Sequence, residues 1–281
     1  MASEGQREEA GVDLGGTEDH FKTSFCSIAD KGERIEEMIP VIARLGYDGI
    51  EIWGPHLEDY LDRGHKLSHL HALLEEEGLE APMVSPYFNF TENVEEREDS
   101  IASAERFVDY AETLDAPLVR AFVSHLGSEE AQPRHWRLAV ESLKEIAGLG
   151  AKQGVGFALE IHSGQLMDTT STSLQLVRRV AEENVGLNLD IYNLYERGED
   201  PLTALDRLYP HVVHVHAKNG KAGSGENSLG QFLAEGDMDY RPFLRELRER
   251  KFGGFVSVEY FGPADWAEAA RRELKYLDRF T

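Results

Sequence analysis

The chain has 281 residues, 41% of them hydrophobic, and carries 29 lysines and arginines against 52 aspartates and glutamates, a formal net charge of −23. This charge repels nucleic-acid phosphates and anionic membrane surfaces, so we expect neither nucleic acid nor a membrane as a partner. Cys26 is the only cysteine, which excludes an intrachain disulfide. No segment approaches the roughly 18 apolar residues of a membrane-spanning helix, and we expect a soluble, cytoplasmic protein.

Residues 1–20 are acidic and rich in glycine, and we expect them to form a flexible tail without the basic and apolar regions of a signal peptide. From residue 21 to residue 281, short runs of β-branched and aromatic residues alternate with longer stretches of helical period, and no linker divides the chain. This alternation predicts βα units and a parallel sheet in one domain. Eight strands are expected, at residues 22–26, 49–53, 82–85, 118–123, 156–161, 186–190, 212–216 and 254–259.

The stretches between these strands have the pattern of helices that cover a sheet. In residues 34–46, for example, apolar side chains recur at spacings of three and four, a glycine ends the pattern, and Pro40 predicts a kink. Strand and helix together take about thirty residues, as a βα unit requires. The chain therefore predicts a (β/α)8 TIM barrel. The polar, glycine-rich stretch 219–227 follows the seventh strand and is a candidate lid.

Ionisable side chains close four of the later strands, at Glu160, Asp190, His216 and Glu259. Residues of a barrel that carry out chemistry project from the carboxyl ends of its strands, and the alternation of each strand turns these four side chains inward. Three converging carboxylates repel one another unless a cation neutralises them. Any one of these residues would equally suit an isolated structural role, but together they predict a site for one divalent metal ion.

Carboxylates and one imidazole form a ligand set that favours a particular group of metals. Oxygen-rich sites suit Mn²⁺, Mg²⁺ or Co²⁺, and Zn²⁺ is also compatible with this set.

The same segments resemble motifs of the xylose isomerase-like barrel superfamily of sugar isomerases and epimerases, in matching order along nearly the whole chain. The matching segments are residues 159–162, 189–193, 213–219, 233–240 and 256–260. The resemblance implies that the four strand-end residues hold one metal ion and that Glu160 and Glu259 also transfer protons. Relatives often pair, so the resemblance is compatible with a homo-oligomer.

Two positions depart from the pattern of this superfamily. Asn193 stands where many relatives have a histidine, and Asn219 stands where many have an aspartate. An amide at Asn193 can still hydrogen-bond a sugar hydroxyl. Candidate substrate-binding residues, all on or beside strand ends, are His162, Asn193, His214, Lys218, Glu51 and Arg120. For each of the two histidines, a hydrogen-bonded interior role is an equal alternative.

A divalent ion bound to a carbonyl and its neighbouring hydroxyl acts as a Lewis acid and stabilises the enediolate that forms when a base removes the adjacent proton. With Glu160 and Glu259 as the acid and base, this chemistry predicts an isomerase or epimerase of a small sugar or polyol, either a ketose, an aldose or a keto-inositol. The same enediolate can expel a β-hydroxyl. A dehydratase of the keto-inositol or dehydroshikimate type is therefore the alternative.

Two further classes share this barrel. An endonuclease IV-like DNA repair enzyme uses a trinuclear zinc cluster with additional histidines, but Asn193 replaces one of them and the charge of −23 opposes DNA binding. A non-catalytic sugar-binding barrel is the second class. The presence of Glu160 and Glu259 favours a catalytic barrel over a non-catalytic one.

Overall fold

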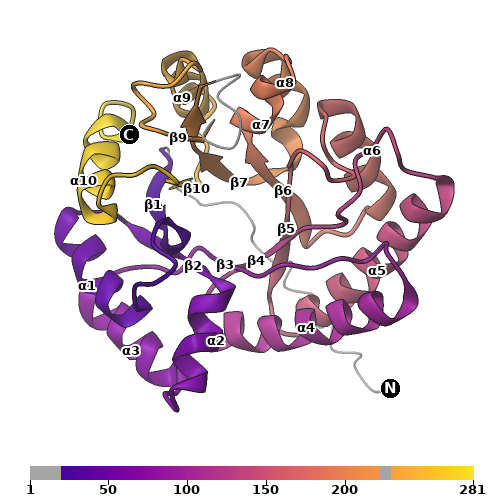
Figure 1. Cartoon of the computed structure of the whole chain (residues 1–281), viewed down its shortest axis with the longest axis horizontal. Coiled ribbons are helices and arrows are strands. Elements are labelled where there is room, and N and C mark those ends of the chain that lie inside the picture. The colour runs from indigo at the N-terminus through magenta and orange to yellow at the C-terminus, as the bar shows by residue number, and fades with distance from the viewer. Residues whose placement is uncertain (1–19, 222–228) are drawn as a thin grey trace, which may run out of the picture.

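The computed structural model describes residues 20–221 and 229–281. Parallel strands close into a barrel in the order β1-β10-β7-β6-β5-β4-β3-β2, and helices surround it (Figure 1). The barrel strands are β1 Lys22–Cys26, β2 Gly49–Trp53, β3 Met83–Ser85, β4 Leu118–Ala121, β5 Gly156–Glu160, β6 Val185–Asp190, β7 Val212–Ala217 and β10 Phe255–Val258. The predicted (β/α)8 barrel is confirmed. The predicted tail up to residue 19 and most of the candidate lid lie outside the described residues.

A small sheet and the surrounding helices complete the fold. Two short antiparallel strands, β8 and β9, border residues 222–228 at Asn219–Gly220 and Leu229–Gln231. The helices are α1 Ile35–Leu45, α2 Gly54–Asp62, α3 Leu67–Glu77, α4 Val94–Thr113, α5 Pro133–Ala151, α6 Thr170–Val180, α7 Ile191–Glu196, α8 Pro201–Leu208, α9 Tyr240–Glu249 and α10 Trp266–Leu277, with 3-10 turns at Ser27–Ala29 and Tyr209–His211. Within the described residues, no helix is long and apolar enough to cross a membrane.

Helix α1 shows how the sequence pattern becomes a packed element. Its apolar residues Ile35, Met38, Ile39 and Ile42 are buried against the barrel, while Pro40 lies within the helix. The helix ends at Gly46, whose φ of 101° is a left-handed conformation that costs glycine little and other residues more.

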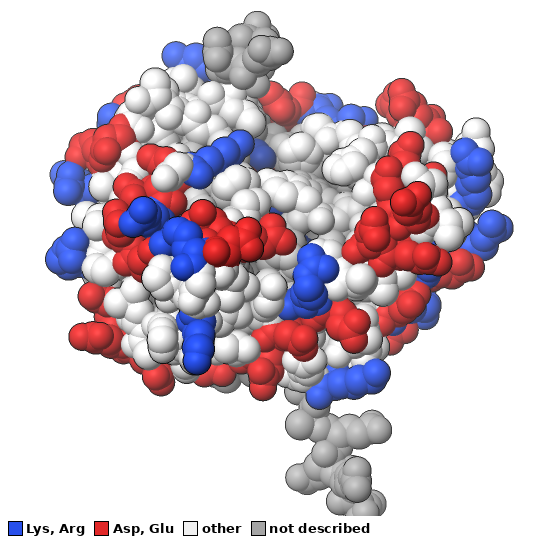
Figure 2. Space-filling model, turned by 60° about the horizontal axis from the view of Figure 1, so that its bottom comes forward, with Lys and Arg blue, Asp and Glu red and all other residues white. Residues whose placement is uncertain are grey.

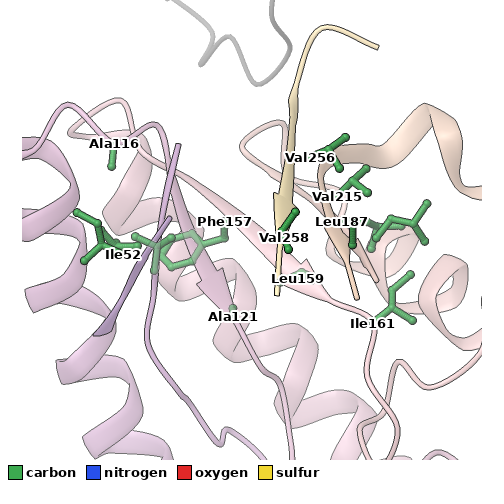
Figure 3. Packing of buried hydrophobic residues seen from close by; sticks show 14 of the residues in the cluster. Ile52, Ala116, Ala121, Phe157, Leu159, Ile161, Leu187, Val215, Val256 and Val258 are labelled. Atoms are coloured by element: carbon green, nitrogen blue, oxygen red, sulfur yellow. The ribbon is translucent and has the colours of Figure 1, made fainter. Parts of the chain in front are cut away.

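Alternation along the strands separates the hydrophobic core from the barrel interior. Phe157, Leu159, Leu187 and Val258 belong to the main hydrophobic cluster (Figure 3). Their neighbours of opposite parity, such as Glu160, point into the barrel. Removing apolar area from water stabilises the fold by about 25 cal/mol for each Å², so the outer layer supplies the stability and leaves the interior free for polar groups.

A β-bulge interrupts the alternation in β7. Val212 pairs with Leu187 and His214 with the next residue of β6, so Val213 is an additional residue. Val213 packs against the interior cluster of Met83, Leu118 and Ala158, and a Cβ at Gly186 would lie 2.4 Å from its side chain. Simple alternation would have turned Val213 outward with Val215. The bulge places an apolar residue below His214 inside the barrel.

Several strands end earlier than the sequence pattern predicts. Strands β4, β5 and β10 end at Ala121, Glu160 and Val258, because the residues beyond these points leave the ladder to form the barrel mouth. On the surface, Figure 2 shows acidic side chains outnumbering the basic ones on the displayed face, as the net charge of −23 leads one to expect.

Candidate metal centre

Four buried side chains converge inside the barrel at the carboxyl ends of its strands. They are Glu160, Asp190, His216 and Glu259. One ligand atom from each lies within 4.8 Å of the corresponding atoms of the other three. Glu160 and Asp190 are the last residues of β5 and β6, and the Glu259 N–H donates to the Ala217 carbonyl at 3.0 Å. The structure thus brings together the four residues that the sequence predicted as metal ligands.

Local backbone structure orients the Asp190 carboxylate. Asp190 precedes α7, and its Oδ1 accepts the N–H of Asn193 at 3.2 Å, which caps the helix. Its other oxygen, Oδ2, lies 2.5 Å from Nζ of Lys218. Asp190 also pairs in register with His216 across β6 and β7, so the two side chains lie at one level of the barrel.

Two buried cations contact the carboxylates. The Arg120 guanidinium lies 3.0 Å from Glu160 and 3.9 Å from Glu259, and Nζ of Lys218 lies 3.4 Å from Glu259. Burial alone raises the pKa of Glu160. The charges of Arg120 and His216 outweigh the effect of burial and hold the pKa of Glu160 below its ordinary value. Burial raises the pKa of Asp190 despite the adjacent ammonium. The two buried cations therefore offset part of the negative charge of the three carboxylates.

His216 connects this cluster to the residues beneath it. Its Nε2 lies 2.9 Å from Glu51, while its Nδ1 lies 3.6 Å from Glu160 Oε1 and 3.5 Å from Glu259 Oε2. Among the described residues, Nδ1 has no hydrogen-bond partner. Burial lowers the pKa of His216, but Glu51 and Glu259 raise it well above its ordinary value. The raised pKa means that the His216 imidazole is protonated on both nitrogens when no ion is bound. A divalent ion fits here, because it would displace the proton of Nδ1 and take this nitrogen and the carboxylate oxygens as ligands.

A cavity of about 400 Å³ reaches this cluster from the barrel mouth. One of its walls is aromatic, because the rings of Tyr87 and Phe122 stack with centroids 5.4 Å apart. The Arg120 guanidinium lies 4.8 Å and 4.7 Å from the two ring centroids. The cavity therefore offers a flat apolar surface beside the carboxylates, with space for a small molecule.

Three of the predicted substrate-binding residues line this cavity: Arg120, His162 and Lys218. His162 is half-buried, and its Nδ1 lies 2.7 Å from the Ser163 carbonyl oxygen. This contact requires a proton on Nδ1 and leaves Nε2 as an acceptor. These three residues stay candidates for contact with a substrate.

The other three predicted substrate-binding residues do not line the cavity. Glu51 and His214 are fully buried below it, 3.2 Å apart. The Asn193 side chain is also buried, and its amide donates to the Ile161 carbonyl at 2.9 Å. Strand-end position suggested contact with a substrate, but Glu51 is only the third residue of β2 and His214 precedes the strand end by three residues. The side chains of these three residues contact buried neighbours and do not line the cavity.

Asn219, the second departure from the superfamily pattern, has a structural explanation. Its amide nitrogen donates to the carbonyls of Leu233 and Met238 at 3.0 Å and 2.8 Å, and its Oδ1 accepts the Gly220 N–H at 2.9 Å. An aspartate carboxylate could not donate these two hydrogen bonds. Asn219 therefore ties the segment after β9 to the end of β7.

The sequence did not single out several residues that line the cavity, among them Phe122, Phe261 and Lys31. Phe122 and Phe261 each follow a site residue by two positions, at Arg120 and Glu259. That spacing from a site residue is the signal that could have identified them, although both phenylalanines lie beyond the ends of β4 and β10.

Comparisons with known proteins place this geometry in a family. Residues 39–280 match the family model described as xylose isomerase-like TIM barrel. A 3-dehydroshikimate dehydratase of Bacillus anthracis is 26% identical over 274 residues, which cover 92% of this chain and 96% of that protein. An inosose dehydratase of Clostridium perfringens is 26% identical over 160 residues, 50% of this chain and 54% of that protein. A fructoselysine 3-epimerase of Shigella flexneri is 22% identical, covering 85% and 90%.

Solved structures have the same barrel. The probable 3-DHS dehydratase AsbF of Bacillus anthracis, involved in petrobactin synthesis, superposes with a TM-score of 0.83 at 25% identity and covers 92% of this chain and 99% of that chain. The IOLI protein with a binding zinc atom has a TM-score of 0.81 at 21% identity, with coverage of 93% and 99%. The second similarity extends to the fold alone.

Proposed function

Because the chain belongs to the xylose isomerase-like TIM barrel family, we propose that it is a metal-dependent dehydratase that removes water from a cyclic hydroxyketone of the 3-dehydroshikimate type. The similarity to the Bacillus anthracis dehydratase carries this proposal, since it spans 92% of this chain and 96% of that protein. The similarity to an inosose dehydratase favours the same reaction class. The sugar isomerase or epimerase that the sequence favoured is the alternative.

In this proposal the four converging residues hold one divalent ion: Glu160, Asp190, His216 and Glu259. When bound, the ion supplies a Lewis acid that polarises the substrate carbonyl. The oxygen-rich ligand set favours Mn²⁺, Mg²⁺ or Co²⁺ and is compatible with Zn²⁺. Arg120, 3.0 Å from Glu160, keeps that carboxylate ionised and oriented.

Loss of water requires removal of a proton beside the carbonyl and delivery of a proton to the departing hydroxyl. The electron pair of the broken C–H bond forms the new double bond as the C–O bond breaks, and the hydroxyl leaves with a proton as water. We place the proton transfer on His162, which lines the cavity with Nε2 as an acceptor. After accepting the proton, the same imidazole is able to donate it to the leaving hydroxyl.

The resemblance to the superfamily alone would place this role on Glu160 and Glu259. Glu160, however, lies 3.0 Å from the buried Arg120 guanidinium, whose charge lowers the pKa of the Glu160 carboxyl and so makes it a weaker base. An epimerase needs a base on each face of its substrate, whereas a dehydratase works with one group that accepts and returns a proton. The ion pair therefore supports the dehydratase over the epimerase.

The test is to incubate metal-loaded protein with 3-dehydroshikimate, a keto-inositol and a ketose in deuterated water. We expect 3-dehydroshikimate to lose water, seen as a new ultraviolet absorbance of the conjugated product. His162→Ala should slow this reaction by about 100-fold or more without changing the metal content. Glu273→Gln, which alters a buried carboxyl outside the cavity, serves as the control.

Two results would contradict the proposal. Exchange of a carbon-bound proton of the ketose without loss of water from any substrate would establish the isomerase or epimerase instead. Full dehydratase activity in His162→Ala would remove the assigned role of that imidazole.

A further inference from the structure

Glu51 is a fully buried carboxylate at the centre of a hydrogen-bond cluster directly beneath the metal site. The Nε2 of His216 lies 2.9 Å from its Oε2 and 3.1 Å from its Oε1. The Nε2 of His214 lies 3.2 Å from Oε2, and the Ser85 hydroxyl donates to Oε1. Strands β2, β3 and β7 thus all contribute to the position of this carboxylate.

The surroundings of Glu51 make it an unusual buried charge. Within the described residues, its ion pairs are with the imidazoles of His214 and His216 only, and no lysine or arginine lies within ion-pair distance. Burying a carboxylate costs several kcal/mol unless its partners compensate the lost hydration. A neutral residue of similar volume would avoid this cost, which points to a role of the charge toward its two imidazole partners.

The two ring nitrogens of His216 face opposite ways. A carboxylate only accepts hydrogen bonds, so Glu51 requires a proton on Nε2 of His216. When a bound ion displaces the other proton, the Nδ1 lone pair faces the region between Glu160 Oε1 and Glu259 Oε2, which lie 3.6 Å and 3.5 Å from this nitrogen. A single contact with Glu51 therefore sets which nitrogen is available as a ligand and fixes the plane of the ring.

We propose that Glu51 is the positioning residue of the metal centre, which holds His216 in its ligand tautomer and makes Nδ1 a stronger donor to the ion. This inference rests on the metal site of the proposed function. Carboxylates that accept a hydrogen bond from a ligating histidine orient the ring and increase its basicity in other metal sites. Nothing in this role requires Glu51 to touch a substrate, in agreement with its position below the cavity.

His214 and Ser257 hold Glu51 in turn. The Nε2 of His214 lies 3.2 Å from Glu51 and 2.9 Å from the Ser257 hydroxyl, so the imidazole bridges β10 and the carboxylate. This explains why a second histidine occupies the position two residues before His216 without reaching the cavity. The carboxylate is fixed from both sides before any ion binds.

A second metal ion is the competing interpretation, because Glu51, His214 and His216 also satisfy the geometry of a small ligand cluster. Such an ion would have to replace the hydrogen bonds that join these residues. Our inference therefore predicts one ion for each chain, bound by the tetrad, whereas the competing interpretation predicts two.

The experiment measures Co²⁺ binding to the full chain by calorimetry and by the visible absorption of the bound ion. Wild type should bind one Co²⁺ per chain. Glu51→Gln should weaken binding by about 10- to 100-fold and shift the absorption bands, because the neutral amide is a poorer acceptor. Glu273→Gln, which replaces a buried carboxyl outside the metal site by an amide, should bind within about twofold of wild type.

A spectroscopic measurement tests the tautomer directly. In histidine-labelled, Zn²⁺-loaded wild type, we expect a downfield proton on Nε2 of His216, and in Glu51→Gln this resonance should move upfield. A proton on Nδ1 in the loaded wild type would overturn the inference. If Glu51→Gln fails to fold, Ser85→Ala removes only the hydroxyl contact to Glu51 and should weaken Co²⁺ binding in the same direction, by a smaller factor.

The remaining outcomes separate the two proposals. Wild type that binds one ion together with Glu51→Gln of unchanged affinity would overturn the role of Glu51 and leave the metal site standing. Two ions in wild type and one in Glu51→Gln would establish the second metal site. No ion in wild type would overturn the metal site and the role of Glu51 with it.

Discussion

Two layers of the barrel interior arise from the same strands, two residues apart, and differ completely in character. The lower layer is apolar and consists of Met83, Leu118, Ala158 and Val213. The upper layer is charged, because Arg120 follows Leu118 on β4 and Glu160 follows Ala158 on β5. Apolar burial stabilises the closed barrel, whereas buried charge costs stability unless it is compensated. Stability and chemistry are therefore separated along the direction of the strands.

A change to a carboxylate of the upper layer should cause the greatest loss of activity. Glu160→Gln removes one carboxylate ligand but keeps an oxygen that accepts from Arg120. We expect dehydratase activity at a fixed metal concentration to fall by about 100- to 1000-fold, measured by product absorbance. The midpoint of urea unfolding should change far less than in a lower-layer variant. Unfolding of Glu160→Gln under native conditions would contradict the separation of the two layers.

The lower layer should show the opposite behaviour. Leu118→Ala leaves a cavity in the apolar cluster and should cost about 2–5 kcal/mol of unfolding free energy. Because Leu118 neither lines the cavity nor belongs to the candidate metal ligands, the Michaelis constant and the metal stoichiometry of the folded variant should match wild type. Urea unfolding and enzyme kinetics on the same preparation measure both quantities. A lost metal ion in this variant would show that the layers are coupled.

Glu273 on α10 is a buried carboxyl that lies outside both layers. Burial raises the pKa of Glu273 to about 8. The Leu233 N–H and the charge of Arg272 lower this pKa, and the charge of Glu235 raises it further. A raised folded-state pKa means that stability is fully present below the unfolded value near 4.5 and is lost as pH rises through about 8. The loss is on the order of a few kcal/mol.

Glu273→Gln should remove this contribution, because the amide keeps an acceptor for the Leu233 N–H, 2.9 Å away in the wild type, without titrating. We expect the variant to gain stability over wild type progressively between about pH 5 and pH 8, as measured by unfolding at a series of pH values. If the difference in unfolding free energy between the variant and wild type stayed constant over this range, Glu273 would be charged in the folded protein, as Glu160 is.

The smallest effect is expected at the barrel mouth, where Asn219 joins β7 to the segment after β9. Asn219→Asp replaces a donor by a carboxylate and leaves the carbonyls of Leu233 and Met238 without their partner. We expect a loss of about 1–3 kcal/mol in unfolding free energy. Asn219→Ala, which adds no charge, is the matched control. If Asn219→Asp and wild type were equally stable, the hydrogen bonds of Asn219 would not contribute to the free energy of unfolding.

The sequence could predict those features of the barrel that depend on alternation along a single strand. The eight barrel strands and the convergence of four strand-end residues follow from alternation, since Leu187 and Leu189 outside imply Asp190 inside. Each of these inferences uses only neighbours in the chain. For this reason the fold and the candidate metal ligands were accessible without the structure.

Contacts between strands were not accessible in the same way. The bulge at Val213 changes the parity of β7 and depends on the absence of a side chain at Gly186. The cluster of Glu51 with His214 joins residues 163 positions apart in the chain. Glu51 and His214 therefore looked like substrate-binding residues, whereas the structure gives them partners beneath the cavity.

The most direct test of the metal-dependent dehydratase is to remove bound metal with a chelator and titrate the protein with Mn²⁺ while water loss from 3-dehydroshikimate is followed. We expect no activity in the chelated protein, and activity that rises with added Mn²⁺ and saturates at one ion per chain. Full activity after chelation, or saturation only at two or more ions, would contradict it.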